Sequence, residues 1–238
     1  MTFPRPKPDT PPSMVFVNRA IDCQMKRDNA GGPQEAAERT GDAMALPAEK
    51  ERYTFADVLT WDENGRIEII DGEAVMMAPR SRIHQKISFE IGRQIGNYLE
   101  GKKCEVYPAP FGVRLFEKDG DCPDDVDTLV EPDISVICDN NKLDKHGCKG
   151  SPDMVVEVLS PSTLRHDRFV KLALYQRAGV RDYWIVEPET QTVQVYTLES
   201  GILQPCAFYG AGDVAKVNVL DGCFIELGKV FPTDEKEQ

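Results

Sequence analysis

Hydrophobic residues recur along the chain with two different periods, one typical of helices and one typical of strands. In residues 82–99 an isoleucine or leucine stands at every fourth position: Ile83, Ile87, Ile91, Ile95 and Leu99. This spacing predicts a long amphipathic helix, with Ser81 as its N-cap and Gly101 just beyond its end. A second helix is predicted over residues 163–180, with Ser162 or Thr163 as its N-cap and Gly179 just after its last turn.

Short runs of β-branched and aromatic residues predict strands between and after these helices. Asp71 and Gly72 both tolerate the positive φ of a type I′ turn, so residues 65–78 are predicted to form a hairpin. Further strands are predicted within residues 104–116, 128–138, 153–159, 182–188, 189–201, 215–220 and 224–231. The mixture of helices and strands predicts an α/β or α+β sandwich with a largely central sheet.

Two of the predicted strands carry an acidic residue among apolar ones. In residues 128–138 the acid is Asp133, and in residues 153–159 it is Glu157. Side chains alternate along a strand, so each strand has one apolar face and one face with a carboxylate. An ionised carboxylate among valines and leucines is costly unless a cation neutralises it. The two strands therefore predict that a cation lies beside each acid. Their own residues do not indicate which cation it is.

Either a divalent metal ion or a basic side chain can supply that cation. Neighbouring strands that present carboxylates at one end offer the hard oxygen ligands that Mg²⁺ or Mn²⁺ prefers. The alternative is an arginine paired with each acid at the edge of the sheet. The helix after Glu157 favours the metal, because it would direct Lys171 toward the acid-bearing face. Asp133, Glu157 and Lys171 form a minimal set for metal-dependent phosphodiester hydrolysis.

The charge balance changes this picture only locally. The chain has 238 residues, a net charge of −12 and a pI of about 4.8, and such acidity taken alone argues against a nucleic-acid partner. Segments 80–103 and 164–181 nevertheless gather Lys and Arg residues. We interpret them as solvated helix faces that can still serve an anionic ligand locally.

The ends of the chain and its cysteines bear on domains and location. Residues 1–50 are rich in Pro, Gly and small polar residues, so a flexible extension is predicted there and one folded domain over residues 51–238. No run approaches the ~18 apolar residues of a membrane span. The N-terminus lacks the apolar region of a secretory signal, which predicts a cytoplasmic protein. The seven scattered cysteines are then predicted to be reduced thiols.

Several segments, taken in chain order, resemble the Uma2 family, formerly a domain of unknown function, of the PD-(D/E)XK nuclease superfamily. The matching segments are IEIIDGEAVMMAP, IHQKIS, VRL, EPDISVI, SPDMVVEVLSPST and RHDRFVKLALYQRAGVRDYWIVEP, which span about residues 53–199. The resemblance implies a restriction-endonuclease-like α/β core with a mixed central sheet flanked by helices and an extra N-terminal hairpin. It also implies a divalent ion, Mg²⁺ or Mn²⁺, bound by Asp133 and Glu157.

The family motif assigns a role to each of three residues. Asp133 corresponds to the acid of the Pro132-Asp133 element, and Glu157 corresponds to the acid of the second element. The superfamily pattern places a lysine two residues after that acid, but this chain has Leu159 there. Lys171, on the following helix, is taken as its replacement.

Two further candidates rest on the same resemblance. Glu68, in the hairpin motif, is a possible additional acid of the site, its alternative being an exposed strand residue. His84, near the start of the long helix, is a possible site or phosphate contact, its alternative being a packing or capping role.

Three functions follow from these features and are left open by the sequence. The first is a Mg²⁺-dependent endonuclease that cleaves DNA, for which a homodimer would suit two cuts in a duplex. The second is a catalytically inactive nuclease-fold protein that binds nucleic acid or another protein. The third is an interaction domain whose proline-rich N-terminus docks a partner.

Overall fold

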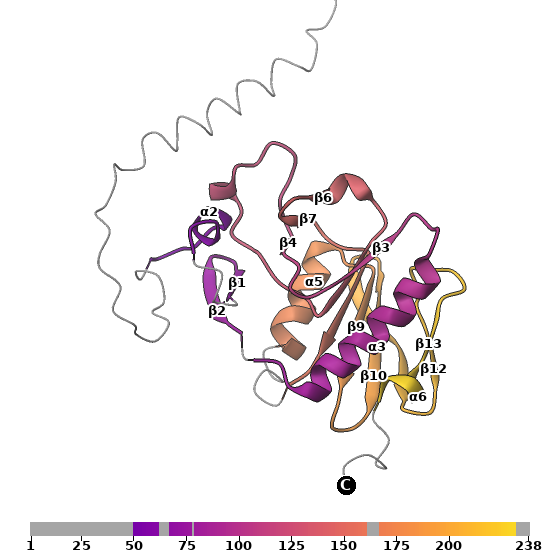
Figure 1. Ribbon diagram of the computed structural model, residues 1–238. Coiled ribbons are helices and arrows are strands. Elements are labelled where there is room, and N and C mark those ends of the chain that lie inside the picture. Colours follow the sequence, from indigo (N-terminus) through magenta and orange to yellow (C-terminus); the bar gives the residue numbers. More distant parts are fainter. Residues whose placement is uncertain (1–49, 62–66, 78, 161–166, 232–238) are drawn as a thin grey trace, which may run out of the picture.

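The computed structural model describes residues 50–61, 67–77, 79–160 and 167–231 (Figure 1). The predicted N-terminal extension lies outside the described residues except for its last one, Lys50. Ser162 and Thr163, the candidate caps of the second predicted helix, lie outside them as well. The flexible extension and the domain boundary therefore stay predictions.

Helical segments are few and most are short. The α-helices are α2 (Phe55–Val58), α3 (Arg82–Leu99), α5 (Leu172–Ala178) and α6 (Leu227–Val230). Two 3₁₀ turns, η1 (Pro123–Asp125) and η2 (Asn140–Lys142), lie in loops. A π-helical segment, η3 (Asp167–Lys171), directly precedes α5.

The strands form one large sheet and three small ones. The large sheet runs in the order β11 (Ile202–Gly210), β10 (Thr192–Glu199), β9 (Asp182–Glu187), β8 (Met154–Val158), β5 (Ile134–Ile137) and β3 (Glu105–Pro108). The small sheets pair β1 (Ile67–Ile70) with β2 (Glu73–Met76), β12 (Val214–Lys216) with β13 (Phe224–Glu226), and β7 (Gly147–Lys149) with both β4 (Val113–Arg114) and β6 (Leu143–Asp144).

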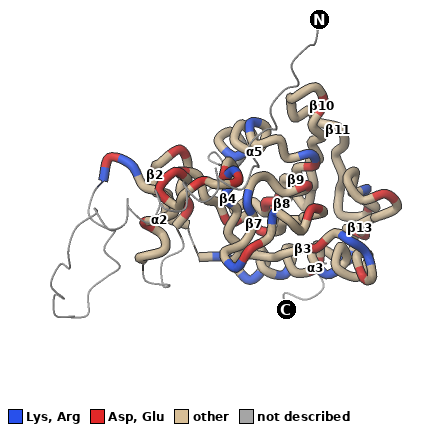
Figure 2. Tube along the Cα trace, turned by 90° about the horizontal axis from the view of Figure 1, so that it is seen from above, with Lys and Arg blue, Asp and Glu red and all other residues tan. Residues whose placement is uncertain are grey.

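The large sheet is mixed and is covered by a helix on each face. Strands β8 and β9 are parallel, whereas the other neighbours are antiparallel. Figures 1 and 2 show α3 along one face of this sheet and α5 against the opposite face. The predicted α/β sandwich with a mixed central sheet, flanked by helices and preceded by a hairpin, is confirmed.

Strand β8 shows how the two faces acquire separate cores. Its alternate residues Met154, Val156 and Val158 belong to the apolar cluster that contains the isoleucines of α3. Val155, and Leu159 just after the strand, belong to the cluster that contains residues of α5. Glu157 lies between those two residues in the alternation, so its carboxylate is on the face that α5 covers. The strand is buried on both faces, as its continuous apolar run predicts.

The sequence signals for α3 and for the first hairpin are confirmed. The hydroxyl of Ser81 accepts a hydrogen bond from the backbone N–H of His84 at 3.2 Å, which is an N-cap contact. The isoleucine stripe of α3 is fully buried at Ile87, Ile91 and Ile95. At the hairpin turn, Asp71 and Gly72 have φ values of 51° and 89°, as a type I′ turn requires.

In other places the sequence prediction is wrong. Residues 140–151, where no strand is predicted, contain β6 and β7, which have only two and three residues and are too short to show a period. Strand β11 is not predicted, because it is an edge strand with mostly exposed residues and a proline, Pro205. The strand predicted over residues 224–231 stops at Glu226, where α6 begins.

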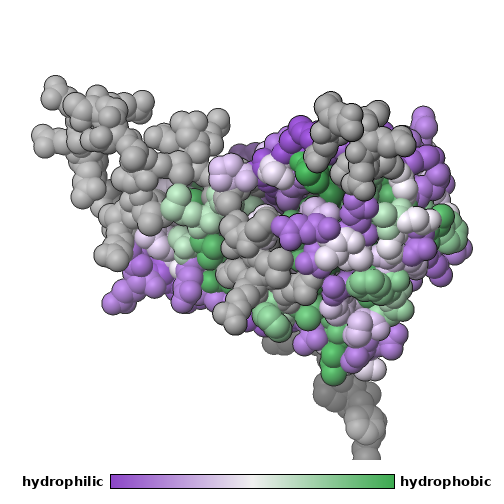
Figure 3. Space-filling model, turned by 90° about the horizontal axis from the view of Figure 1, so that it is seen from below, coloured by the Kyte–Doolittle hydropathy of each residue, from purple (hydrophilic) through white to green (hydrophobic). Residues whose placement is uncertain are grey.

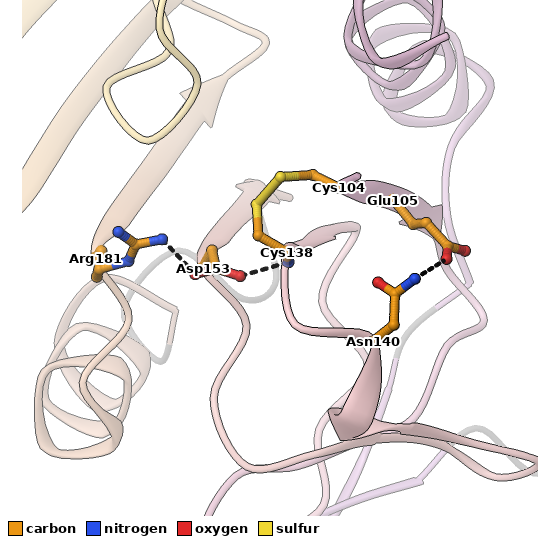
Figure 4. Close-up of a disulfide and its surroundings, with 6 residues drawn as sticks. All are labelled: Cys104, Glu105, Cys138, Asn140, Asp153 and Arg181. Atoms are coloured by element: carbon orange, nitrogen blue, oxygen red, sulfur yellow. Dashed lines mark hydrogen bonds and ion pairs between the residues drawn. A yellow bond between two sulfur atoms is a disulfide. The ribbon is translucent and has the colours of Figure 1, made fainter. Parts of the chain in front are cut away.

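A disulfide joins Cys104 and Cys138 at the edge of the large sheet (Figure 4). It forms because the antiparallel pairing of Glu105 with Ile137 brings the two cysteines opposite each other. The prediction of reduced thiols is therefore wrong for this pair, whereas Cys148, Cys206 and Cys223 are free. Disulfides are uncommon in cytosolic proteins, so the cytoplasmic location stays a prediction.

The surface combines apolar and polar residues. On the face in Figure 3, hydrophobic side chains lie in separate places among hydrophilic ones. The most exposed large apolar side chains are those of Phe169, Phe208 and Phe89, which come from η3, β11 and α3. Among the helices in the described part of the chain, none has the length and apolar character to cross a membrane.

Asp182, the first residue of β9, is fully buried and makes the stability of the fold depend on pH. Its carboxylate accepts hydrogen bonds from Trp184 Nε1 at 3.0 Å and from the backbone N–H of Asn218 at 2.6 Å. Burial raises its pKa from 3.8 to about 6, against the opposing effect of these hydrogen bonds. The folded protein therefore binds a proton here more readily than the unfolded chain.

We expect the stability that this proton contributes to be present below about pH 4 and to be lost as the pH rises through 6. The loss is at most about 3 kcal/mol, because one pKa unit corresponds to about 1.4 kcal/mol. Asp182→Asn should remove this part of the pH dependence. Urea unfolding at pH 4 and pH 7 measures it, with Asp221→Asn, an exposed site, as the control. Equal pH dependence in Asp182→Asn and the wild type would contradict the assignment.

Candidate active site

Asp133 and Glu157 lie opposite each other on paired strands. The antiparallel register of β5 and β8 pairs Ile134 with Val156. Asp133 directly precedes β5 and the first of these residues, and Glu157 follows the second in β8, so the two acids lie at the same end of the paired strands. Each is only 4% exposed. The two predicted metal ligands thus lie at the same end of neighbouring strands, as the sequence predicts.

Glu157 is held by two residues of the helical segment that covers its face. Its Oε1 atom is 2.9 Å from Nζ of Lys171 and accepts a hydrogen bond from the hydroxyl of Tyr175 at 2.6 Å. Lys171 ends η3 and Tyr175 lies one turn further in α5, so the two side chains project from the same side of the helix. The structure therefore places Lys171 beside Glu157, as predicted from the helical spacing.

Glu68 joins the same cluster from the hairpin. It lies in β1, it is 2% exposed, and its Oε1 is 3.1 Å from Nζ of Lys171. That oxygen also accepts a hydrogen bond from the backbone N–H of Glu131 at 3.0 Å. The alternative prediction of an exposed strand residue is wrong, because the hairpin packs its Glu68 side toward the sheet. The ammonium of Lys171 is thus shared between two buried carboxylates.

Asp133 is surrounded by a second set of donors. Its Oδ1 is 2.6 Å from NH2 of Arg80, and its Oδ2 is 3.0 Å from Nε2 of His84. The backbone N–H of Val158 donates to Oδ2 at 2.8 Å. Nδ1 of the buried His84 has no hydrogen-bond partner in the described part of the chain. His84 therefore does reach the predicted site, from the first turn of α3.

The surroundings of these groups set their protonation. Burial raises the pKa of Asp133, but the hydrogen bond and charge of His84, the charge of Arg80 and the N–H of Val158 outweigh it and lower the pKa below 3.8. Burial and the nearby Glu157 raise the pKa of Tyr175 well above 10.0. At neutral pH, Asp133 is therefore ionised and Tyr175 remains a hydrogen-bond donor.

The sequence prediction missed two residues of the site. The sequence also left open that an arginine neutralises each acid. This alternative is confirmed for Asp133, which pairs with Arg80. Glu157 pairs with a lysine instead, Lys171. Arg80 lies two positions before α3, so the helical spacing that links residues of one helix does not connect it with His84. Tyr175 shares a helical face with Lys171. Its position in the sequence resembles that of an apolar core residue, so its contact with Glu157 could not be predicted.

The donor chemistry of Asp133 and Glu157 fits a divalent cation. Carboxylate oxygens are the ligands that Mg²⁺ prefers, and proteins commonly hold Mg²⁺ with one or two carboxylates together with water and substrate phosphate. Among the residues that the structure describes, no group of three or more His, Cys, Asp or Glu side chains is arranged to hold a metal. The two buried carboxylates therefore suit an ion that a phosphate helps to hold.

Comparison with known proteins places this arrangement among nuclease-like folds. The model of the Uma2 family, described as "Putative restriction endonuclease", matches residues 55–228. Two uncharacterized proteins of Synechocystis sp. are similar, one 29% identical over 59% of this chain and 71% of its own length, the other 22% identical over 64% and 85%.

A solved structure shares the fold. The crystal structure of "a putative nuclease belonging to DUF820" from Anabaena variabilis has a TM-score of 0.59 and 18% identity, covering 75% of this chain and 97% of its own. At that identity the likeness concerns the fold alone. The family match spans well over half of the chain and includes every residue of the cluster described above. The chain therefore belongs to the Uma2 family of restriction-endonuclease-like proteins.

Proposed function

We propose that this protein is a Mg²⁺-dependent endonuclease that hydrolyses phosphodiester bonds in DNA. The observation that carries the proposal is the pair of buried carboxylates at the same end of neighbouring strands, Asp133 and Glu157, with the ammonium of Lys171 2.9 Å from Glu157. The family description, which names restriction endonucleases, supports DNA as the substrate. A divalent ion held by the two carboxylates would polarise the scissile phosphate and lower the pKa of an attacking water.

The side chains of the site have separate tasks in this proposal. Lys171 supplies positive charge near the phosphoryl oxygens that gain negative charge as water attacks. Tyr175 orients Glu157 by its hydrogen bond of 2.6 Å, and Glu68 holds the ammonium from the other side at 3.1 Å. His84 and Val158 fix the position of the Asp133 carboxylate. Burial excludes bulk water and strengthens each of these electrostatic contacts.

Exposed basic residues on α3 support the predicted nucleic-acid partner. Arg82, Lys86 and Arg93 are exposed on α3, whose first turn carries His84, and Figure 2 shows basic residues along this helix. Such a row can contact phosphates without sequence preference. The homodimer stays a prediction.

A plasmid assay tests the proposed activity. Supercoiled DNA incubated with the purified protein should become nicked and linear with Mg²⁺ or Mn²⁺, and should stay supercoiled with EDTA. Cleavage that persists in EDTA would contradict the proposed metal dependence. Intact DNA at all metal concentrations would contradict the proposed nuclease activity.

One observation favours the second candidate function, a nuclease-fold protein that binds nucleic acid or protein without cleaving it. Both carboxylates already have basic partners, Arg80 for Asp133 and Lys171 for Glu157. Calorimetry with Mn²⁺ separates the two functions. An active nuclease should bind the ion at millimolar concentration or below, and an inactive one should not.

A further inference from the structure

Arg80 lies in this site, although neither the family motif nor the comparisons assign it a role. It lies two positions before α3, and its guanidinium is 2.6 Å from Oδ1 of Asp133. Its side chain is 15% exposed, against 4% for that of Asp133. The guanidinium therefore reaches the carboxylate from the more accessible side. It occupies Oδ1 of Asp133, an oxygen to which a divalent ion would have to bind.

A guanidinium and a divalent ion compete for that oxygen. Two cations held against one buried carboxylate repel each other strongly, because the surroundings screen charge poorly. The other oxygen, Oδ2, is held independently by His84 and by the backbone N–H of Val158. The carboxylate would thus keep its position if the guanidinium left. Arg80 could therefore leave Asp133 while His84 and Val158 keep their contacts with it.

On the basis of the proposed function, we infer that Arg80 is an exchangeable counterion. It neutralises Asp133 in the metal-free protein. When a divalent ion and DNA bind, it moves from the carboxylate to a phosphate oxygen of the DNA. Guanidinium groups bind phosphates and carboxylates with the same paired N–H geometry, so the exchange replaces one good partner by another.

Metal affinity measured without DNA tests the first half of this inference. In calorimetry with MnCl₂, Arg80→Gln is expected to bind Mn²⁺ about tenfold more tightly than the wild type, because no guanidinium has to be displaced. Arg80→Lys keeps a cation and should bind close to the wild type. Arg177→Gln removes an arginine of α5 that pairs with Asp71 on the surface, and should leave the affinity unchanged. A purely structural Arg80 would give the opposite sign, since its loss would loosen Asp133.

DNA affinity measured with and without metal tests the second half. With Ca²⁺ in place of Mg²⁺, Arg80→Gln and Arg80→Lys should both bind a short duplex about tenfold more weakly than the wild type. In EDTA the three proteins should bind equally, because Arg80 is then engaged with Asp133. A deficit of the same size in EDTA and Ca²⁺ would overturn the exchange.

Different results would contradict the proposed function and the exchange of Arg80. If the wild type binds no Mn²⁺ and cuts no plasmid, the proposed function falls and this inference falls with it. If the wild type binds Mn²⁺ but Arg80→Gln binds it equally or more weakly, the inference alone is overturned. Should Arg80→Gln fail to fold, the Ca²⁺ dependence of DNA binding by Arg80→Lys decides between the two outcomes.

Discussion

Glu157→Gln and Asp133→Asn are each expected to slow plasmid cleavage by about 100- to 1,000-fold or more. Each replacement keeps the shape of the side chain but removes the negative charge that would hold a divalent ion. Each also leaves the apolar packing of its strand unchanged. Cleavage rates at saturating Mg²⁺ measure the effect. Calorimetry with Mn²⁺ should show the affinity falling in parallel.

Controls for this prediction come from the surface of the same protein. Glu226→Gln makes the same chemical change at a carboxylate that is 57% exposed and pairs with Lys229. It should cut at the wild-type rate. Thermal unfolding establishes that each variant is folded before its activity is compared. Wild-type cleavage by both Glu157→Gln and Asp133→Asn would remove the two carboxylates from the chemistry.

Lys171→Met is expected to destabilise the protein by about 3–5 kcal/mol, as breaking one side of a buried ion pair does. Lys171 is 3% exposed, its ammonium contacts both Glu68 and Glu157, and the loss of the ammonium leaves two buried carboxylates without that cation. Cleavage should fall as well, because the charge near the scissile phosphate is lost. Urea unfolding at neutral pH measures the first effect, and the plasmid assay measures the second.

A double variant separates the structural role of Lys171 from its role in cleavage. Adding Glu68→Gln to Lys171→Met removes one of the two carboxylates that lose the ammonium and should restore part of the stability. Cleavage should stay low, since the ammonium is still missing. Lys229→Met, which breaks an exposed pair with Glu226, should cost less than about 1 kcal/mol. A Lys171→Met variant that cuts at the wild-type rate would exclude Lys171 from the reaction.

The local features of this fold could be predicted where the residues that make them are neighbours in sequence. The stripe of isoleucines marked α3, and Ser81 marked its first turn. The Asp71-Gly72 pair marked the first hairpin. The alternation of β8 correctly placed Glu157 on the face opposite Val156, with Val155 and Leu159. Each signal depends on short-range geometry that the backbone imposes whatever lies elsewhere in the chain.

The prediction failed where the deciding partner is distant in sequence or where an element is very short. Cys104 and Cys138 looked like isolated core thiols, and only the pairing of β3 with β5 brings them together. Glu68 had an exposed alternative until the packed hairpin buried it against Lys171, 103 residues away.

By itself, the sequence determined the family and the mixed α/β class, and it supplied the three main candidates for the site, Asp133, Glu157 and Lys171. Only the tertiary structure decided which group neutralises each acid: Arg80 for one, and the Lys171 ammonium, shared with Glu68, for the other. The reason is physical. A strand's alternation determines which face a carboxylate occupies, but the charge that stabilises it comes from whichever segments the folded chain packs against that face.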